Sequence, residues 1–181
     1  MRTARWITTG LLLLFTGCLP SLHPLYMDDD LVFEPALLGV WAGKDETTLV
    51  FEQSDAQSYT LIYTEKGESA RFAAHLMRLG DYLFLDFYPE LPETKNRFYL
   101  AHLLPVHTFG RVALAGEELR ISMADAGWFQ EHLTIRHEEF KKGNEREVVI
   151  TAQTQRLQSF VLEHAENPKA FGDPDVYVRM R

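Results

Sequence analysis

The stretch of sequence that decides the fold is Tyr82-Leu83-Phe84-Leu85-Asp86-Phe87-Tyr88. Side chains alternate between the two faces of a strand, and here both faces are largely apolar. A strand of this kind is covered on both sides, so we expect other elements to pack over its sheet. Asp86 is the one charged residue in the stretch, and in such surroundings a carboxylate must be paired or have a raised pKa. We expect an ion pair with an arginine from another strand, and the candidates are Arg71, Arg78 and Arg111.

The sequence on both sides of this stretch continues the strand pattern. From Gly39 to Asp125, apolar residues recur at alternate positions, and turn residues interrupt them roughly every ten positions. This pattern predicts a meander of antiparallel strands. The expected strands span residues 40–44, 48–53, 58–65, 70–79, 82–88, 98–104, 108–114 and 118–124.

The rest of the chain supplies elements that can cover the sheet. Asp125 is a suitable N-cap for a helix that places Trp128 and Phe129 on one face, and Thr154 is a suitable cap for a second helix. The segment 141–147 is predicted to be a polar loop, and short strands are expected at 148–151 and 176–178. The predicted fold is therefore α+β, with an antiparallel, curved or barrel-like meander and two packed helices.

The N-terminus has the pattern of an exported protein. Arg2 and Arg5 precede an apolar run at residues 6–15, and small residues follow. The stretch Leu-Leu-Leu-Leu-Phe-Thr-Gly-Cys, which ends at Cys18, resembles the lipobox of bacterial lipoproteins. The resemblance implies a signal peptide at 1–17, a lipid on Cys18, a lipidated tether at 18–36 and one globular domain at 37–181. It also implies a location in the bacterial cell envelope, at the outer membrane and facing the periplasm in a Gram-negative cell.

The composition limits the possible partners. The 181 residues carry a formal charge of −8, which becomes −10 when the signal peptide leaves with its two arginines. So acidic a protein is not expected to bind nucleic acid over a broad face. Cys18 is the only cysteine, so an intramolecular disulfide is excluded. The expected partners are the membrane, through the anchor at Cys18, and an envelope protein or an apolar ligand.

Gly39-Val40-Trp41, at the start of the first expected strand, is similar to the Gly-x-Trp motif of lipocalins. The resemblance implies a small barrel that carries an apolar ligand, with a large ring filling its closed end. In such a carrier, the candidate ligand-lining residues are Trp41, Tyr82, Phe84 and Tyr88. The alternative is that Trp41 is a core residue of an unrelated β domain.

The sequence contains no motif that indicates a metal site or a catalytic site. The pairs His102/His107 and His132/His137 are each five residues apart, which places two side chains on opposite faces of a strand. Capping or surface roles are therefore expected for these histidines. The chain has no Gly-x-Ser-x-Gly motif and no Ser-x-x-Lys motif. We expect no metal, no cofactor and no enzymatic activity.

Three segments, Ser21–Tyr26, Leu37–Trp41 and Ile150–Gln158, resemble those of uncharacterised bacterial lipoproteins. That resemblance implies no particular activity. The leading hypothesis is a membrane-anchored envelope lipoprotein with a non-enzymatic scaffolding or interaction role. The alternative is a lipocalin-like carrier of a small apolar ligand. Either hypothesis expects residues 37–181 to fold alone as a soluble domain.

Overall fold

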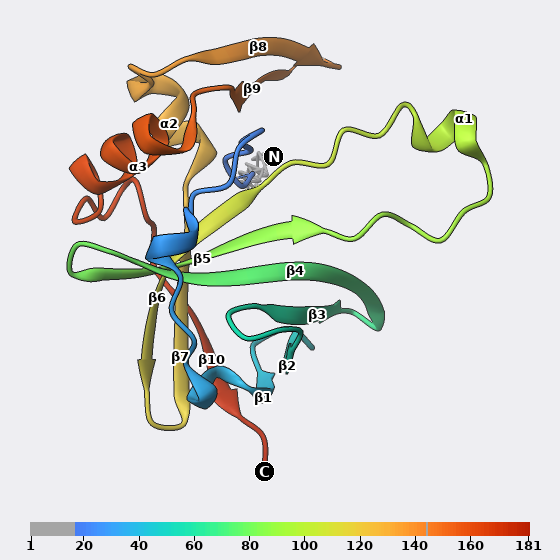
Figure 1. The fold of residues 1–181 in the computed structure, drawn as a ribbon, viewed down its shortest axis with the longest axis vertical. Helices are drawn as coiled ribbons and strands as arrows, with labels where there is room; N and C mark the ends of the chain where they lie inside the picture. Colours follow the sequence, from blue (N-terminus) through green and yellow to red (C-terminus); the bar gives the residue numbers. More distant parts are fainter. Residues whose placement is uncertain (1–16, 144) are drawn as a thin grey trace, which may run out of the picture.

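The main body of the protein is a closed barrel of eight antiparallel strands (Figure 1). The computed structural model describes residues 17–143 and 145–181, so most of the predicted signal peptide lies outside the described residues. The predicted α+β fold with a barrel-like meander is confirmed. The strands of the barrel are β1 (Gly39–Ala42), β2 (Thr48–Gln53), β3 (Tyr59–Glu65), β4 (Glu68–Leu79), β5 (Tyr82–Pro89), β6 (Thr108–Ala115), β7 (Glu118–Met123) and β10 (Asp175–Arg179).

The barrel closes through its last strand, because β10 lies between β1 and β7. Trp41 pairs with Arg179 on one side, and Leu119 pairs with Tyr177 on the other. Between β7 and β10 the chain leaves the barrel and builds a second layer, at the top of Figure 1. This layer contains α2 (Ala126–His132), β8 (His137–Lys142), β9 (Glu145–Ile150) and α3 (Thr154–Glu163).

The alternation of β5 divides its side chains between two hydrophobic cores. Leu85 and Phe87 belong to the core inside the barrel. Phe84 belongs to a second core between the outer face of the barrel and the α2/α3 layer, which also contains Phe129 and Phe160. The expectation that a strand apolar on both faces must be covered on both sides is thus confirmed.

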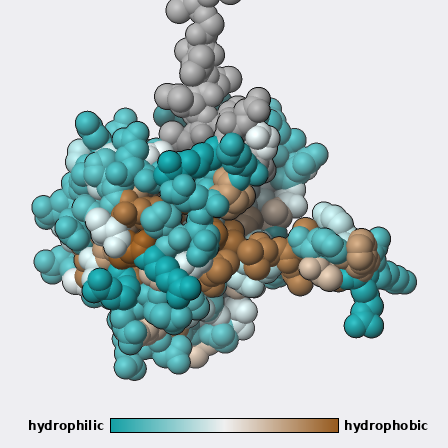
Figure 2. Space-filling model, turned by 90° about the horizontal axis from the view of Figure 1, so that it is seen from above, coloured by the Kyte–Doolittle hydropathy of each residue, from teal (hydrophilic) through white to brown (hydrophobic). Residues whose placement is uncertain are grey.

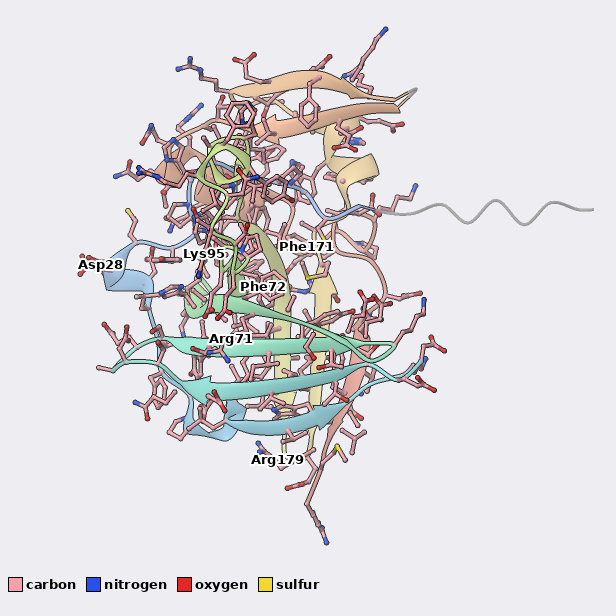
Figure 3. All side chains as sticks on the ribbon, turned by 90° about the vertical axis from the view of Figure 1, so that its right-hand side faces the viewer. Asp28, Arg71, Phe72, Lys95, Phe171 and Arg179 are labelled. Atoms are coloured by element: carbon pink, nitrogen blue, oxygen red, sulfur yellow. The ribbon has the colours of Figure 1, made fainter. Side chains whose placement is uncertain are left out.

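One end of the barrel is closed around Trp41. The short helical turn η2 (Pro35–Leu37) lies beneath it, and the indole N–H of Trp41 donates a hydrogen bond to the carbonyl of Leu37 at 2.8 Å. The guanidinium of Arg179 lies 4.2 Å from the centroid of the Trp41 ring and donates to the carbonyls of Ala36 and Leu38. Figure 3 shows Arg179 at the end of the barrel away from β8 and β9.

Residues 18–36 form an integral part of the fold. Leu19, Ser21 and Leu25 are all fully buried, and the two leucines belong to the core under α2 and α3. The backbone of Ser21 exchanges hydrogen bonds with that of His107, at 2.9 Å and 2.8 Å. A short turn, η1 (Asp28–Asp30), precedes the contact of Val32 with β4. The predicted tether at 18–36 is therefore packed against the body along both its near and its far half.

Three other predictions about local structure were wrong. Residues 98–104 do not form a strand; the chain there contains the short helix α1 (Arg97–Leu100). The predicted polar loop at 141–147 is instead the end of one strand and the start of the next in the β8–β9 hairpin, which turns at Gly143 with φ +64°. Thr154 is the first residue of α3 rather than its cap, and its hydroxyl donates to the carbonyl of Pro24 at 2.9 Å. By contrast, the carboxylate of Asp125 caps α2 as predicted, accepting the N–H of Trp128.

An apolar arm, residues 90–106, projects from the body between β5 and β6 (Figures 1 and 2). It carries four of the exposed large hydrophobic residues: Leu91, Phe98, Tyr99 and Leu104. Phe98 is the most exposed, at 78%. Over residues 17–143 and 145–181, no helix is both long and apolar enough to cross a membrane.

A candidate ligand cavity in the barrel

The barrel contains a cavity of about 660 Å³ at the end opposite Trp41. Its walls are mostly apolar side chains that point inward from several strands of the barrel, and they include Leu49, Leu61, Phe72, Phe87 and Ile121. Cys18, Asp173 and Asp175 lie at its mouth, where they are exposed to solvent. A volume of this size is within the range of roughly 300–1,000 Å³ typical of small-molecule sites.

The two halves of the barrel interior differ in how closely their side chains pack. Near the closed end, Trp41, Phe51 and Tyr59 are buried and pack together in the inner core. Towards the mouth, the inward-pointing residues leave open space between them. A small residue helps to shape the wall here: a Cβ on Gly43 would lie 2.7 Å from the ring of Tyr177. Gly43 therefore allows this ring to lie close against the first turn of the barrel.

Two tyrosines add polar atoms to the apolar walls. Tyr177 is 8% exposed, and burial, reinforced by the charge of Asp175, raises the pKa of its hydroxyl well above the usual range. Burial also raises the pKa of Tyr63, and the charges of Glu65 and Asp175 add to this effect. Both hydroxyls are therefore protonated at neutral pH and can donate hydrogen bonds to an uncharged oxygen or nitrogen atom. Such a wall can hold an apolar chain and orient one polar group.

Cys18, the predicted lipidation site, lies at the mouth of the cavity. Its backbone pairs with that of Asp125, and the carbonyl of Gly17 accepts the N–H of Ala126 at 3.1 Å. Desolvation by the surrounding atoms raises the pKa of the Cys18 thiol, and the charge of Asp175 raises it further. The thiol is therefore protonated at neutral pH and poorly nucleophilic in the folded protein.

The four aromatic residues predicted to line a ligand site lie elsewhere. Trp41 is fully buried at the closed end of the barrel. Phe84 is sealed in the outer core, with its ring 5.7 Å from that of Phe171. Tyr82 lies on the outside of the barrel and donates its hydroxyl to Glu166 at 2.6 Å. The ring of Tyr88 stacks at a tilt on His107, at 4.5 Å. None of these four residues lines the cavity near Cys18.

Asp86 is paired as predicted, but not with an arginine. Its side chain is fully buried on the outer face of β5. One carboxylate oxygen lies 2.6 Å from Nδ1 of His107, and the other accepts the backbone N–H of Leu25 at 2.9 Å. The arginine prediction was wrong because Arg71 pairs with Glu90 and Arg111 binds the carbonyl of Ala165. Because Asp86 is sealed under the N-terminal segment, we assign it a structural role.

Three other histidines have backbone partners, whereas the buried Nδ1 atom of His75 has no hydrogen-bond partner among the described residues. The Nδ1 atoms of His102, His132 and His137 each lie within 2.8 Å of a nearby backbone carbonyl oxygen. The ring of His75 stacks on Tyr26, and burial lowers the pKa of this histidine. Within the part of the chain that the structure describes, no group of three or more His, Cys, Asp or Glu side chains is arranged to hold a metal ion.

Comparisons with protein-family models, with curated proteins and with solved structures gave no match to this chain. The proposals below therefore rest on the geometry of the cavity, the barrel and the N-terminal segment.

Proposed function

We propose that this protein binds a small apolar molecule inside its barrel. The main support for this proposal is the cavity of about 660 Å³, which has an apolar wall and an exposed mouth. Eight-stranded barrels are wide enough to be filled by side chains or to hold one small ligand, and this barrel is filled at one end only. The proposed role is binding without catalysis.

The test of this function is a variant that fills the cavity. Thr108 points into it from the start of β6, so Thr108→Trp places a large ring in the ligand volume. We expect the wild-type domain to bind the uncharged fluorescent probe N-phenyl-1-naphthylamine with a stoichiometry of one. We expect Thr108→Trp to raise the Kd of the probe by about tenfold or more. A tenfold change in Kd corresponds to a loss of only about 1.4 kcal/mol of binding free energy. Thr108→Val, which is close in size to the native residue, is the matched control and should bind as the wild type does. Equal binding by all three proteins would reject the cavity as the site.

We also infer that Cys18 carries a lipid that anchors the protein in the cell envelope. The lipobox-like sequence supports this inference, as does the position of Cys18 on the exposed rim of the cavity. Anchoring at this residue holds the mouth of the barrel close to the membrane surface. An apolar ligand then passes between membrane and cavity over a short path.

Replacing Cys18 by Ser is expected to abolish lipid attachment. A hydroxyl is a much weaker nucleophile than a thiol, so the Ser variant should accumulate as the unprocessed precursor. The measurement is incorporation of labelled palmitate, together with the mass of the mature protein, in the cell that produces it. Incorporation of palmitate into the Cys18→Ser variant would contradict the assignment.

A second candidate function is contact with an envelope protein through the apolar arm. The observation in its favour is the exposure of Phe98 and Leu104, at 78% and 71%, because isolated proteins rarely leave such residues clustered in solvent. A photo-crosslinking residue at position 98 should then capture one defined protein in the producing cell. The same residue at position 178, where Val178 is 53% exposed on β10, is the control. Identical cross-linking patterns at both positions would reject the arm as a specific contact.

A further inference from the structure

Among the described residues, the lining of the cavity carries negative charge at its mouth and includes no cation. Three carboxylates, those of Asp125, Asp173 and Asp175, are part of the cavity lining, and no Lys, Arg or His residue belongs to it. The carboxylate of Asp125 accepts the N–H of Trp128 at the N-terminus of α2. Asp173 and Asp175 are exposed and form no ion pair with the rest of the described chain.

The turns of the barrel add further carboxylates at the same end. The register places Ala42 opposite both Val178 and Thr48, and Thr48 opposite Thr64. The β1–β2 and β3–β4 turns therefore lie near Asp175, at the open end. These turns contribute Asp45, Glu46, Glu65 and Glu68, against only two cations, Lys44 and Lys66.

The negative potential extends into the cavity itself. The charge of Asp175 raises the pKa of Cys18 at the mouth and those of Tyr63 and Tyr177 on the walls. A cleft with low-dielectric walls focuses the field of the charges at its rim. An anionic headgroup at this mouth is therefore repelled, and it finds no cation in the lining to pair with.

We propose that the cavity selects amphiphiles with an uncharged or cationic headgroup and rejects fatty acids and other anionic lipids. This inference rests on the proposed binding function and names the chemical class of its ligand. The apolar walls hold a single chain, the tyrosine hydroxyls donate to an uncharged polar group, and the rim carboxylates attract a cation. The same rim disfavours a carboxylate or phosphate headgroup.

The test compares three ligands that share a twelve-carbon chain and differ in headgroup charge: 1-dodecanol, dodecyltrimethylammonium and dodecanoate. Each displaces N-phenyl-1-naphthylamine, below its micelle concentration, from the domain that begins at Cys18 with an acetylated N-terminus, so that no α-ammonium is added at the mouth. We expect dodecanoate to bind about tenfold or more weakly than dodecanol, and dodecyltrimethylammonium to bind at least as tightly as dodecanol.

The salt dependence of binding is a second test of this charge selectivity. Raising the ionic strength from about 0.01 M to about 1 M shortens the Debye length from about 30 Å to about 3 Å. The preference for the cation over dodecanoate should therefore shrink, while dodecanol binding stays nearly constant.

The double variant Asp173→Asn/Asp175→Asn should reduce the preference for the cation over dodecanoate by about tenfold. Its matched control is Glu52→Gln/Glu117→Gln, which removes two exposed carboxylates at the closed end and should keep the wild-type preference. Dodecanoate binding as tightly as dodecanol, at low salt and in the wild type, would overturn the proposed selectivity and leave the binding function intact. No binding of the probe or of any of the three ligands would overturn the binding function, and the selectivity with it.

Discussion

A chain that begins at Leu37 is expected to lose most or all of its stability relative to a chain that begins at Cys18. Residues 18–36 place Leu19 and Leu25 in the outer core, both with 0% exposure. Losing a buried leucine typically costs about 2–5 kcal/mol. The deletion also removes the backbone N–H of Leu25 and leaves one oxygen of the buried Asp86 without its donor, which adds about 1–3 kcal/mol. The total is comparable to the roughly 5–15 kcal/mol of a whole domain.

This expectation replaces the one made from the sequence, which took residues 37–181 as the independent folding unit. The measurement is the denaturant midpoint of the two chains, followed by far-ultraviolet circular dichroism. The control keeps the full segment and carries Leu22→Ala, because Leu22 lies in the same segment and is 38% exposed. It should change stability by no more than about 1 kcal/mol. A shortened chain that unfolds at the same midpoint as the chain from Cys18 would show that the segment is dispensable.

Phe84→Ala is expected to cost about 3–5 kcal/mol and to leave ligand binding unchanged in the fraction that remains folded. Phe84 is fully buried and sealed between β5 and the α2/α3 layer, with aromatic contacts to Tyr82 and Phe171. Truncation leaves a hole that this packed layer cannot close. The residue points away from the cavity, so the probe should still bind with native affinity.

The control for this experiment is Phe98→Ala, which removes the same atoms from the exposed arm. It should change the free energy of unfolding by no more than about 0.5 kcal/mol. Denaturant titrations give the stability of both variants, and titration with N-phenyl-1-naphthylamine gives the binding. A stable Phe84→Ala protein with altered probe affinity would place Phe84 on a cavity wall and contradict the structure.

The alternation of apolar residues was sufficient to predict the barrel-like meander, but not which face of β5 points inward. Both faces of residues 82–88 are apolar, because one lines the barrel and the other lies beneath the helices. The ligand-lining prediction chose the face with more aromatic rings, which is the outer one. The cavity residues Tyr63, Phe72 and Tyr177 lie on three different strands. Only the register of those strands brings their side chains together, and one sequence does not reveal that register.

Two predictions about local structure were wrong because the composition of a segment did not match its burial or its secondary structure. The apolar run at residues 98–104 predicts a strand, although Phe98 and Leu104 are exposed on the arm. The charged run at 141–147 predicts a loop, although the β8–β9 hairpin needs no apolar residue there and an ion pair joins Arg146 to Glu139. The burial of Leu19 gives no signal in the sequence either, because Pro20 and Pro24 on its C-terminal side favour extended backbone. Extended backbone can equally lie along the outside of a barrel, as it does here.

The central claim is that the cavity inside the barrel is a ligand site, and photolabelling tests it most directly. A twelve-carbon alcohol with a diazirine near the end of its chain is irradiated with the protein, and the labelled residues are identified by tandem mass spectrometry. We expect labels on cavity-wall residues such as Leu49, Leu61 and Phe72, and the loss of these labels when excess 1-dodecanol is present. Labels confined to exposed residues of the arm, such as Leu91, Phe98 and Leu104, would show that the ligand does not enter the barrel.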